Sequence, residues 1–251
     1  MYRLLLISLL TLVTCSIYSQ ELTQGKSTIN QNNFYTEIQQ HFHIIDSLRR
    51  VNFDLMEDEN LKLQETIKNY KEDIFNLNDT LDFDWLYITK SADSKFCLVT
   101  WDTRMGGTMI DFATMTIFKK RNGELVSKLL IDTSNSEITM HYDTIYIVST
   151  SQNIYYLAQG FGQGSTALPW QEIRAFQIKK DELLTPTIFP ENKANLFAEF
   201  DTHQFNEQER IPTIKIKENG KIILVPKATE QEGFSGKYET FVLEGEIYKA
   251  K

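Results

Sequence analysis

The fold is decided by residues 95–131, KFCLVTWDTRMGGTMIDFATMTIFKKRNGELVSKLLI, in which apolar and polar residues alternate. A period of two is typical of β-strands, and it predicts strands over Lys95–Trp101, Met109–Lys119 and Glu124–Ile131. Asn122-Gly123 separates the last two strands, which predicts a tight hairpin turn with positive φ at both residues. Connections this short cannot hold crossover helices, so we expect an antiparallel sheet.

The alternation continues to the C-terminus and predicts an antiparallel β domain over residues 85–251. A second Asn-Gly pair, Asn219-Gly220, predicts another hairpin within it. The further strands are predicted over Leu86–Lys90, Glu137–Tyr142, Thr144–Thr150, Asn153–Ala158, Glu172–Lys179, Leu183–Ile188, Thr213–Lys217, Lys221–Pro226 and Tyr238–Tyr248.

A weak internal repeat runs through this domain. Phe96-Cys97-Leu98-Val99 is echoed by Ile154-Tyr155-Tyr156-Leu157, and Ile117-Phe118-Lys119-Lys120 is echoed by Gln177-Ile178-Lys179-Lys180. A shorter third copy runs through Ile214–Lys217. Four strands per unit resemble a propeller blade, but three units are fewer than a closed propeller uses. The predicted fold is therefore mainly β with an N-terminal helical segment, arranged as an antiparallel meander, a sandwich or an incomplete propeller.

Residues 33–81 predict the helical segment, because neither Gly nor Pro occurs between Lys26 and Met105. One interpretation is an intrachain pair of helices, residues 33–50 and 54–78, the second starting at a capping box of Asp54 and Glu57. The alternative is a homodimer, a coiled coil through Phe53–Leu81 with Asn60 in its seam. Weak charge pairing beside the seam favours the intrachain pair. The apolar residues recur at spacings of three and four: Phe34, Ile38, Phe42, Ile45, Leu48, Phe53, Met56, Leu63, Ile67, Tyr70, Ile74, Leu77 and Leu81.

Residues 1–19 resemble a cleaved signal peptide, with Arg3 before an apolar run over Leu4–Val13 and a cleavage site at Ser19-Gln20. Residues 20–32 then form a polar linker. We therefore expect an exported protein that is periplasmic, at the cell surface or extracellular. Leu12-Val13-Thr14-Cys15 resembles a bacterial lipobox, so lipidation at Cys15 is the alternative and the one route to membrane attachment.

The composition and motifs argue against several functions. The net charge of −8 argues against a nucleic-acid partner, because phosphate backbones are bound by clustered Lys and Arg. Gly160–Ser165 resembles a phosphate loop, yet a strand follows it where a helix is needed. His41, His43 and Asp46 do not have the spacing of metal ligands on one helix face. We expect no metal, no cofactor and no enzymatic activity.

One candidate ligand site remains, at two loops, Trp101–Thr108 and Gly160–Trp170. The repeat relates them, because Met105-Gly106-Gly107-Thr108 is echoed by Gln163-Gly164-Ser165-Thr166. If both leave the same sheet edge, their aromatic and polar side chains share a rim suited to a glycan or a peptide. The six candidate residues are Trp101, Asp102, Arg104, Phe161, Gln163 and Trp170. The alternative, which the sequence favours, is that the two tryptophans anchor the core. The expected function is thus a binding or assembly module, and the alternative is an exported hydrolase of a glycan or peptide that uses acidic pairs such as Asp102 with Asp111.

The sequence combines three features: the run Trp-Asp-Thr-x-x-Gly-Gly-Thr-Met at 101–109, the signal peptide, and the pattern Phe-x-x-x-Gly-x-x-Tyr at 241–248. Together they resemble uncharacterised exported β-rich proteins of the Bacteroidota. The resemblance covers the last two-thirds of the chain. It implies a bacterial envelope or extracellular setting, and it implies no activity.

Overall fold

The computed structural model describes residues 33–77, 84–107, 109–130, 139–165, 167–204, 211–229 and 233–251. The expected signal peptide (1–19), the linker (20–32) and the lipidation candidate Cys15 lie outside the described residues. No helix in the described ranges is both long enough and apolar enough to cross a bilayer.

Two helices of the N-terminal segment lie side by side within the chain. The first, here called the N-terminal helix, occupies residues 33–48, and the second is α2 (Phe53–Asn69), followed by the short α3 (Lys71–Asn76). α2 starts earlier than the expected capping box at Asp54, because Asn52 is its N-cap and accepts a hydrogen bond from the Leu55 amide at 3.0 Å. The chain reverses between the two helices at Arg50, where φ is +65°.

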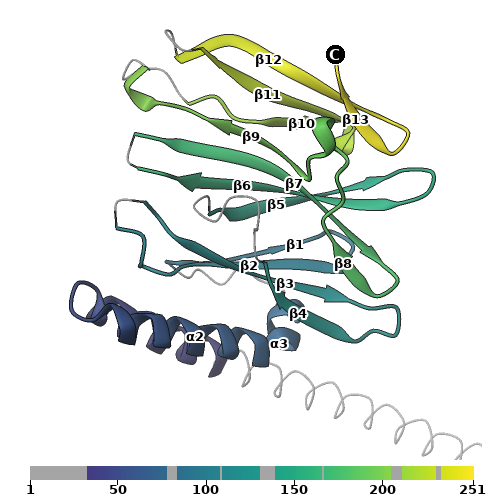
Figure 1. Cartoon of the computed structure of the whole chain (residues 1–251). Helices are drawn as coiled ribbons and strands as arrows, with labels where there is room; N and C mark the ends of the chain where they lie inside the picture. The colour runs from purple at the N-terminus through teal and green to yellow at the C-terminus, as the bar shows by residue number, and fades with distance from the viewer. Residues whose placement is uncertain are drawn as a thin grey trace, which may run out of the picture.

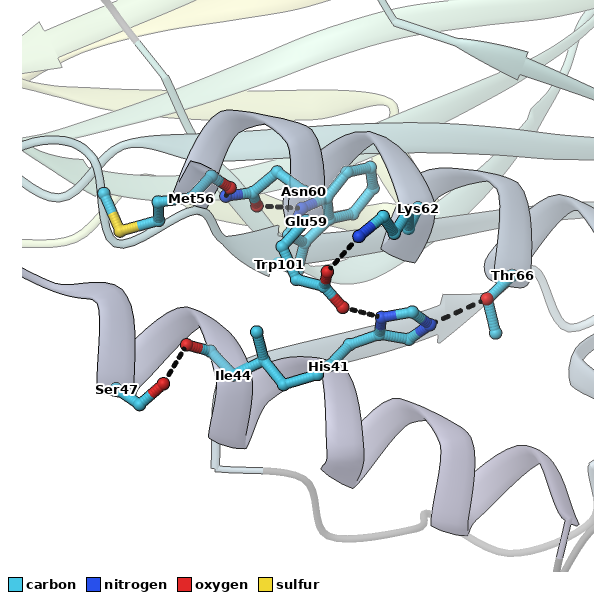
Figure 2. A network of polar contacts seen from close by, with 9 residues as sticks. All are labelled: His41, Ile44, Ser47, Met56, Glu59, Asn60, Lys62, Thr66 and Trp101. Atoms are coloured by element: carbon cyan, nitrogen blue, oxygen red, sulfur yellow. Dashed lines mark hydrogen bonds and ion pairs between the residues drawn. The ribbon is translucent and has the colours of Figure 1, made fainter. Parts of the chain in front are cut away.

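Polar contacts join the two helices to each other and to the sheet beneath (Figure 2). His41 of the N-terminal helix lies 2.7 Å from Glu59 and 2.9 Å from Thr66, both on α2. Asn60 donates to the carbonyl oxygens of Met56 and Thr103, each at 3.0 Å. The residue expected in a dimer seam is thus bonded within the chain; the homodimer through Phe53–Leu81 stays a prediction.

The strands form three antiparallel sheets, which confirms the expected β meander. Sheet 1 contains β1 (Leu86–Lys90), β2 (Phe96–Asp102), β3 (Phe112–Lys119) and β4 (Leu125–Leu129) in that order. Sheet 2 contains β5 (His141–Ser149), β6 (Ile154–Gln163), β7 (Pro169–Lys179) and β8 (Glu182–Leu184), and β9 (Asn195–Glu199) pairs with the first half of β7. Sheet 3 contains β10 (Lys215–Lys217), β11 (Ile222–Thr229), β12 (Gly233–Glu244) and β13 (Ile247–Ala250).

The helices and the three sheets are stacked as layers, with the helices against sheet 1 and sheet 3 at the far end (Figure 1). Each gap between layers holds a separate core. Strand β2 shows how one strand serves two cores, because Cys97 and Val99 pack toward the helices while Phe96 and Leu98 pack toward sheet 2. Such a strand is apolar on both faces, which explains its continuous apolar run.

Three expected strand boundaries are wrong. Only the end of the expected strand Glu137–Tyr142 is strand among the described residues: His141 and Tyr142 belong to β5, together with the expected Thr144–Thr150 up to Ser149. A bulge between Tyr142 and Thr144 shifts the alternation without ending the pairing, and Glu137 lies outside the described residues. Tyr238–Tyr248 splits at Gly245 (φ +65°) into β12 and β13. Leu183–Ile188 is cut to the three residues of β8, and β9 has no counterpart among the predicted strands.

The hairpin turns also differ from expectation. At Asn122-Gly123 only Gly123 has positive φ (+89°), because five residues separate β3 from β4 and the turn ends in a glycine bulge. The expected positive φ at both residues does occur at Asn219-Gly220 (+53° and +90°). The two-residue turn between β7 and β8 places Lys180 and Asp181 at +53° and +64°, although neither is glycine.

Candidate functional site

A cleft of about 810 Å³ lies between sheets 1 and 2, at the end where the β3–β4 and β7–β8 hairpins meet. Sheet 1 contributes Lys95 and the turn after β3, and sheet 2 contributes the turns after β5 and β7. A cavity of this size is in the range of small-molecule binding sites. The stacking of the two sheets therefore creates a site that neither sheet has alone.

The cleft is cationic in a chain that is acidic overall. The protein has 26 Lys and Arg against 34 Asp and Glu, whereas six cationic residues and one acidic residue line the cleft. Low-dielectric walls lined by one sign of charge focus the field into a cleft and attract counter-charges. The cationic residues are Lys95, Lys119, Lys120, Arg121, Lys179 and Lys180, and the carboxylate is Asp181.

Four of these cations occupy equivalent positions of the repeat. Lys119 is the last residue of β3, the third strand of sheet 1, and Lys120 follows it; Lys179 is the last residue of β7, the third strand of sheet 2, and Lys180 follows it. This Lys-Lys pair marks the repeat in the sequence, and no site was predicted from it. The recurrence of two adjacent cations at the same place in both copies was the signal that could have found the cleft.

Two of the cations have weak partners at the surface. Lys120 Nζ lies 2.9 Å from Glu124 Oε1, and Lys179 Nζ donates to Asn153 Oδ1 at 3.5 Å. Lys119 Nζ lies 5.1 Å from the centroid of the buried Phe75 ring, in the core between the helices and sheet 1, so its ammonium group is directed away from the cleft. Lys180 is exposed and makes no ion pair or hydrogen bond with any described residue. Because exposed pairs of this kind contribute little free energy, an incoming anion can displace them at small cost.

Arg121 and Asp181 tie the two hairpins together at the cleft. The Arg121 amide donates to Asp181 Oδ1 at 2.8 Å, and the guanidinium Nη2 lies 3.5 Å from Oδ2. The hydrogen bond from the Arg121 amide lowers the pKa of Asp181 below its ordinary value. The Arg121 side chain is nevertheless 79 % exposed, so most of the guanidinium faces solvent.

Neutral polar side chains form the wall opposite the sheet 1 hairpin. Thr150, Ser151, Gln152 and Asn153 make the turn between β5 and β6. Asn153 is held on two sides, because its Nδ2 donates to Glu246 Oε2 at 2.7 Å and its Oδ1 accepts from Gln177 Nε2 at 2.7 Å. These contacts fix the wall to sheet 3 as well as to sheet 2.

The floor of the cleft includes Tyr156, whose hydroxyl donates to Asp93 Oδ2 at 2.9 Å. Its ring packs on Phe96, with 5.4 Å between the ring centroids. Burial, followed by the contact with Asp93, raises the pKa of Tyr156 far above its ordinary value. The phenol is thus a neutral, fixed part of the floor.

The expected rim residues lie at the other end of the same strands. The structure does bring the two loops together, since the Ile110 amide donates to the Gln163 carbonyl oxygen at 3.3 Å. Trp101 and Trp170, however, are only 1 % and 6 % exposed, so neither offers a ring face to a ligand. This agrees with the alternative that the sequence favours, in which both tryptophans anchor the core.

Glycines make room for one of these anchors. A Cβ on Gly162 would lie 1.9 Å from Trp170 Nε1, and a Cβ on Gly164 would lie 2.5 Å from Cζ3 of the same ring. The indole Nε1 donates to the Thr139 carbonyl oxygen at 3.1 Å. The glycine-rich run 160–165 therefore serves packing, and its first four residues belong to strand β6.

Asp102 and Arg104, also expected at the rim, form an ion pair, with 3.3 Å between Arg104 Nη1 and Asp102 Oδ2. The Arg104 guanidinium lies 4.0 Å from the centroid of the Trp85 ring, and burial raises the pKa of Asp102 above its ordinary value. Asp111, named as an acidic partner for hydrolysis, accepts a hydrogen bond from the Thr103 hydroxyl at 2.6 Å. Phe161 packs near His141, with 6.0 Å between ring centroids.

Comparison with known proteins adds no relative from which a role could be transferred. The chain matches no protein-family model, no curated protein and no solved structure. The cationic cleft is therefore assessed from its own geometry and charge.

Proposed function

We propose that this protein is a non-enzymatic binding module that holds an anionic ligand in the cleft between sheets 1 and 2. The observation that carries the proposal is the reversal of charge, because six cationic residues and one acidic residue line a cleft in a chain of net charge −8. Clustered cationic side chains repel one another and lower the stability of the fold. Their placement around a cavity therefore favours a ligand of opposite charge.

The chemistry of the lining suits binding. Amines and a guanidinium supply hydrogen-bond donors that carry charge, and such donors bind carboxylate, sulfate and phosphate oxygens more strongly than neutral donors do. The Asp181 carboxylate is engaged with Arg121, and the Thr150 hydroxyl donates to Glu246 at 2.8 Å. The hydrolase alternative relied on Asp102 and Asp111, which are bonded to neighbours at the opposite end of the strands.

Export remains part of this proposal. A signal peptide at 1–19 would place the module in the periplasm, at the cell surface or outside the cell, where it would meet anionic polymers of the envelope and surroundings. Lipidation at Cys15 would instead hold it at a membrane. The intact mass of the protein from its host distinguishes a start at Gln20 from a lipidated start at Cys15.

Calorimetric titration of the full chain with dextran sulfate, and with neutral dextran as the matched ligand, tests the anion site. We expect binding to dextran sulfate alone, with an affinity that falls as salt screens the charges. The double substitution Lys179→Glu with Lys180→Glu should weaken binding by about tenfold, since two exposed contacts of roughly 0.7 kcal/mol each are lost.

The matched control is Lys217→Glu with Lys221→Glu, which makes the same change of charge at exposed positions outside the cleft. It should bind dextran sulfate nearly as the native protein does. Equal weakening by both double substitutions would mean that net charge governs binding, and the cleft would then have no special role.

A further inference from the structure

We infer that the ligand of this cleft is an acidic oligosaccharide, a chain of sugar units that carry carboxylate or sulfate groups. The inference rests on the anion-binding function proposed above and goes further by naming the class of ligand. Three features of the cleft support it: the spread of its cations, the neutral polar wall and the absence of an exposed aromatic ring from its described lining.

The cations are spread along the cleft and do not converge on one point. Lys95 precedes β2, Lys120 follows β3, and Lys179 Nζ is held at Asn153 of the β5–β6 turn. Arg121 lies between the two hairpins, on Asp181. A single phosphate would engage a few of these groups, whereas a chain with repeated anionic groups engages cations on both sheets at once.

The neutral wall suits sugar hydroxyls. A hydroxyl both donates and accepts, and amide and hydroxyl side chains offer both roles, unlike lysine, which only donates. The Gln152 side chain is exposed and has no hydrogen-bond partner among the described residues, so both ends of its amide are available. Ile154, 43 % exposed beside this turn, adds an apolar surface for the C–H face of a sugar ring.

The aromatic content of the lining argues against single-stranded nucleic acid, the other common polyanion. Proteins that bind it stack successive bases on exposed aromatic side chains. Among the described residues of the lining, Tyr156 is the sole aromatic, and its ring is buried against Phe96. The cleft thus offers charge and hydrogen bonds without a stacking surface.

The test compares three polyanions of matched charge on the full chain: oligogalacturonate, polyglutamate and oligothymidylate, with a neutral galactose oligomer as the uncharged reference. We expect oligogalacturonate to bind at least about tenfold more tightly than the other two polyanions, which is the effect of a few added hydrogen bonds. The neutral oligomer should bind far more weakly than oligogalacturonate.

The substitution Gln152→Ala separates sugar recognition from charge. It should weaken oligogalacturonate binding severalfold and leave polyglutamate binding unchanged, while the control Gln40→Ala, at an exposed position of the N-terminal helix, should alter neither. Thermal melting of both variants checks that the fold is kept.

The outcomes distinguish this inference from the proposed function. Equal affinity for all three polyanions would overturn the oligosaccharide class and leave the anion site standing, and a preference for oligothymidylate would do the same. Binding of none of them, together with none of dextran sulfate, would overturn both. Equal binding of neutral and acidic galactose oligomers would overturn the anion site itself.

Discussion

The interface between sheets 1 and 2 has two ends, and each presents an arginine in a different state. At the loop end, the Arg104 side chain is 17 % exposed, lies on the Trp85 ring and is paired with Asp102. At the hairpin end, the Arg121 side chain is 79 % exposed, and its Nη2 lies 3.5 Å from Oδ2 of Asp181. The same residue type is part of the folded framework at one end and available to a ligand at the other.

This difference teaches that residue type alone does not mark a binding site. The loop end has the aromatic and charged residues usually associated with ligands, yet its tryptophans are buried and Arg104 is paired with Asp102, with only the buried Arg104 Nε left without a hydrogen bond in this pair among the described residues. The hairpin end has ordinary lysines, which become significant because two sheets bring them to one cavity. Burial and the quality of existing partners decide which end is free to bind.

The largest expected effect is a loss of stability at the loop end. Trp101→Ala should lower the free energy of unfolding by about 3–5 kcal/mol, because it leaves a large cavity in a close-packed core. It also leaves the Asn60 Oδ1 without the indole donor now 3.2 Å away. The matched substitution at the hairpin end, Ile154→Ala, should cost less than about 1 kcal/mol, since its side chain is largely exposed. Urea denaturation measures both, and similar costs would contradict the contrast between the two ends.

An intermediate effect on stability is expected from replacing the two arginines, one at each end. Arg104→Ala should cost about 1–3 kcal/mol of stability, because it removes a packed guanidinium and leaves Asp102 partly buried without its partner. Arg121→Ala should lower the free energy of unfolding by less than about 0.5 kcal/mol, since the hydrogen bond from the backbone amide of residue 121 to Asp181 is kept. Dextran sulfate titration should give the reverse order, with Arg121→Ala the weaker binder. A loss of binding confined to Arg104→Ala would place the ligand at the loop end.

The smallest expected effect is a pH dependence at the wall of the cleft. Hydrogen bonds from Asn153 and Thr150 lower the pKa of Glu246 below its ordinary value of 4.5. A carboxylate with a lowered pKa in the folded state stabilises the fold above its unfolded pKa, and this contribution is lost as the pH falls through the folded pKa. The melting temperature should thus fall less steeply below pH 4.5 in Glu246→Gln than in the native protein. Parallel curves would show that Glu246 contributes nothing to the acid dependence.

Much of the fold could be predicted from the chain because it depends on local periodicity. The buried face of the helices and the runs of apolar and β-branched residues in β1, β2 and β3 are repeated signals that many residues share. The errors fall where one residue alters the pattern, as at the β5 bulge and at Gly245. The candidate site was less predictable, since its cations come from turns where alternation carries no information.

The sequence by itself determined the helical segment, the antiparallel strands and the repeat that places Lys119-Lys120 and Lys179-Lys180 in equivalent positions. Tertiary structure alone decided that these two pairs border one cavity, and it chose between the rim and the core for Trp101 and Trp170, which are buried as the sequence favoured. The physical reason is that alternation assigns a side chain to one face of a sheet, while stacking decides what covers that face. In this protein both faces of sheets 1 and 2 are covered over most of their area, so Trp101 and Trp170 become core, whereas Tyr87 and Phe197 on outer strands stay 36 % and 37 % exposed.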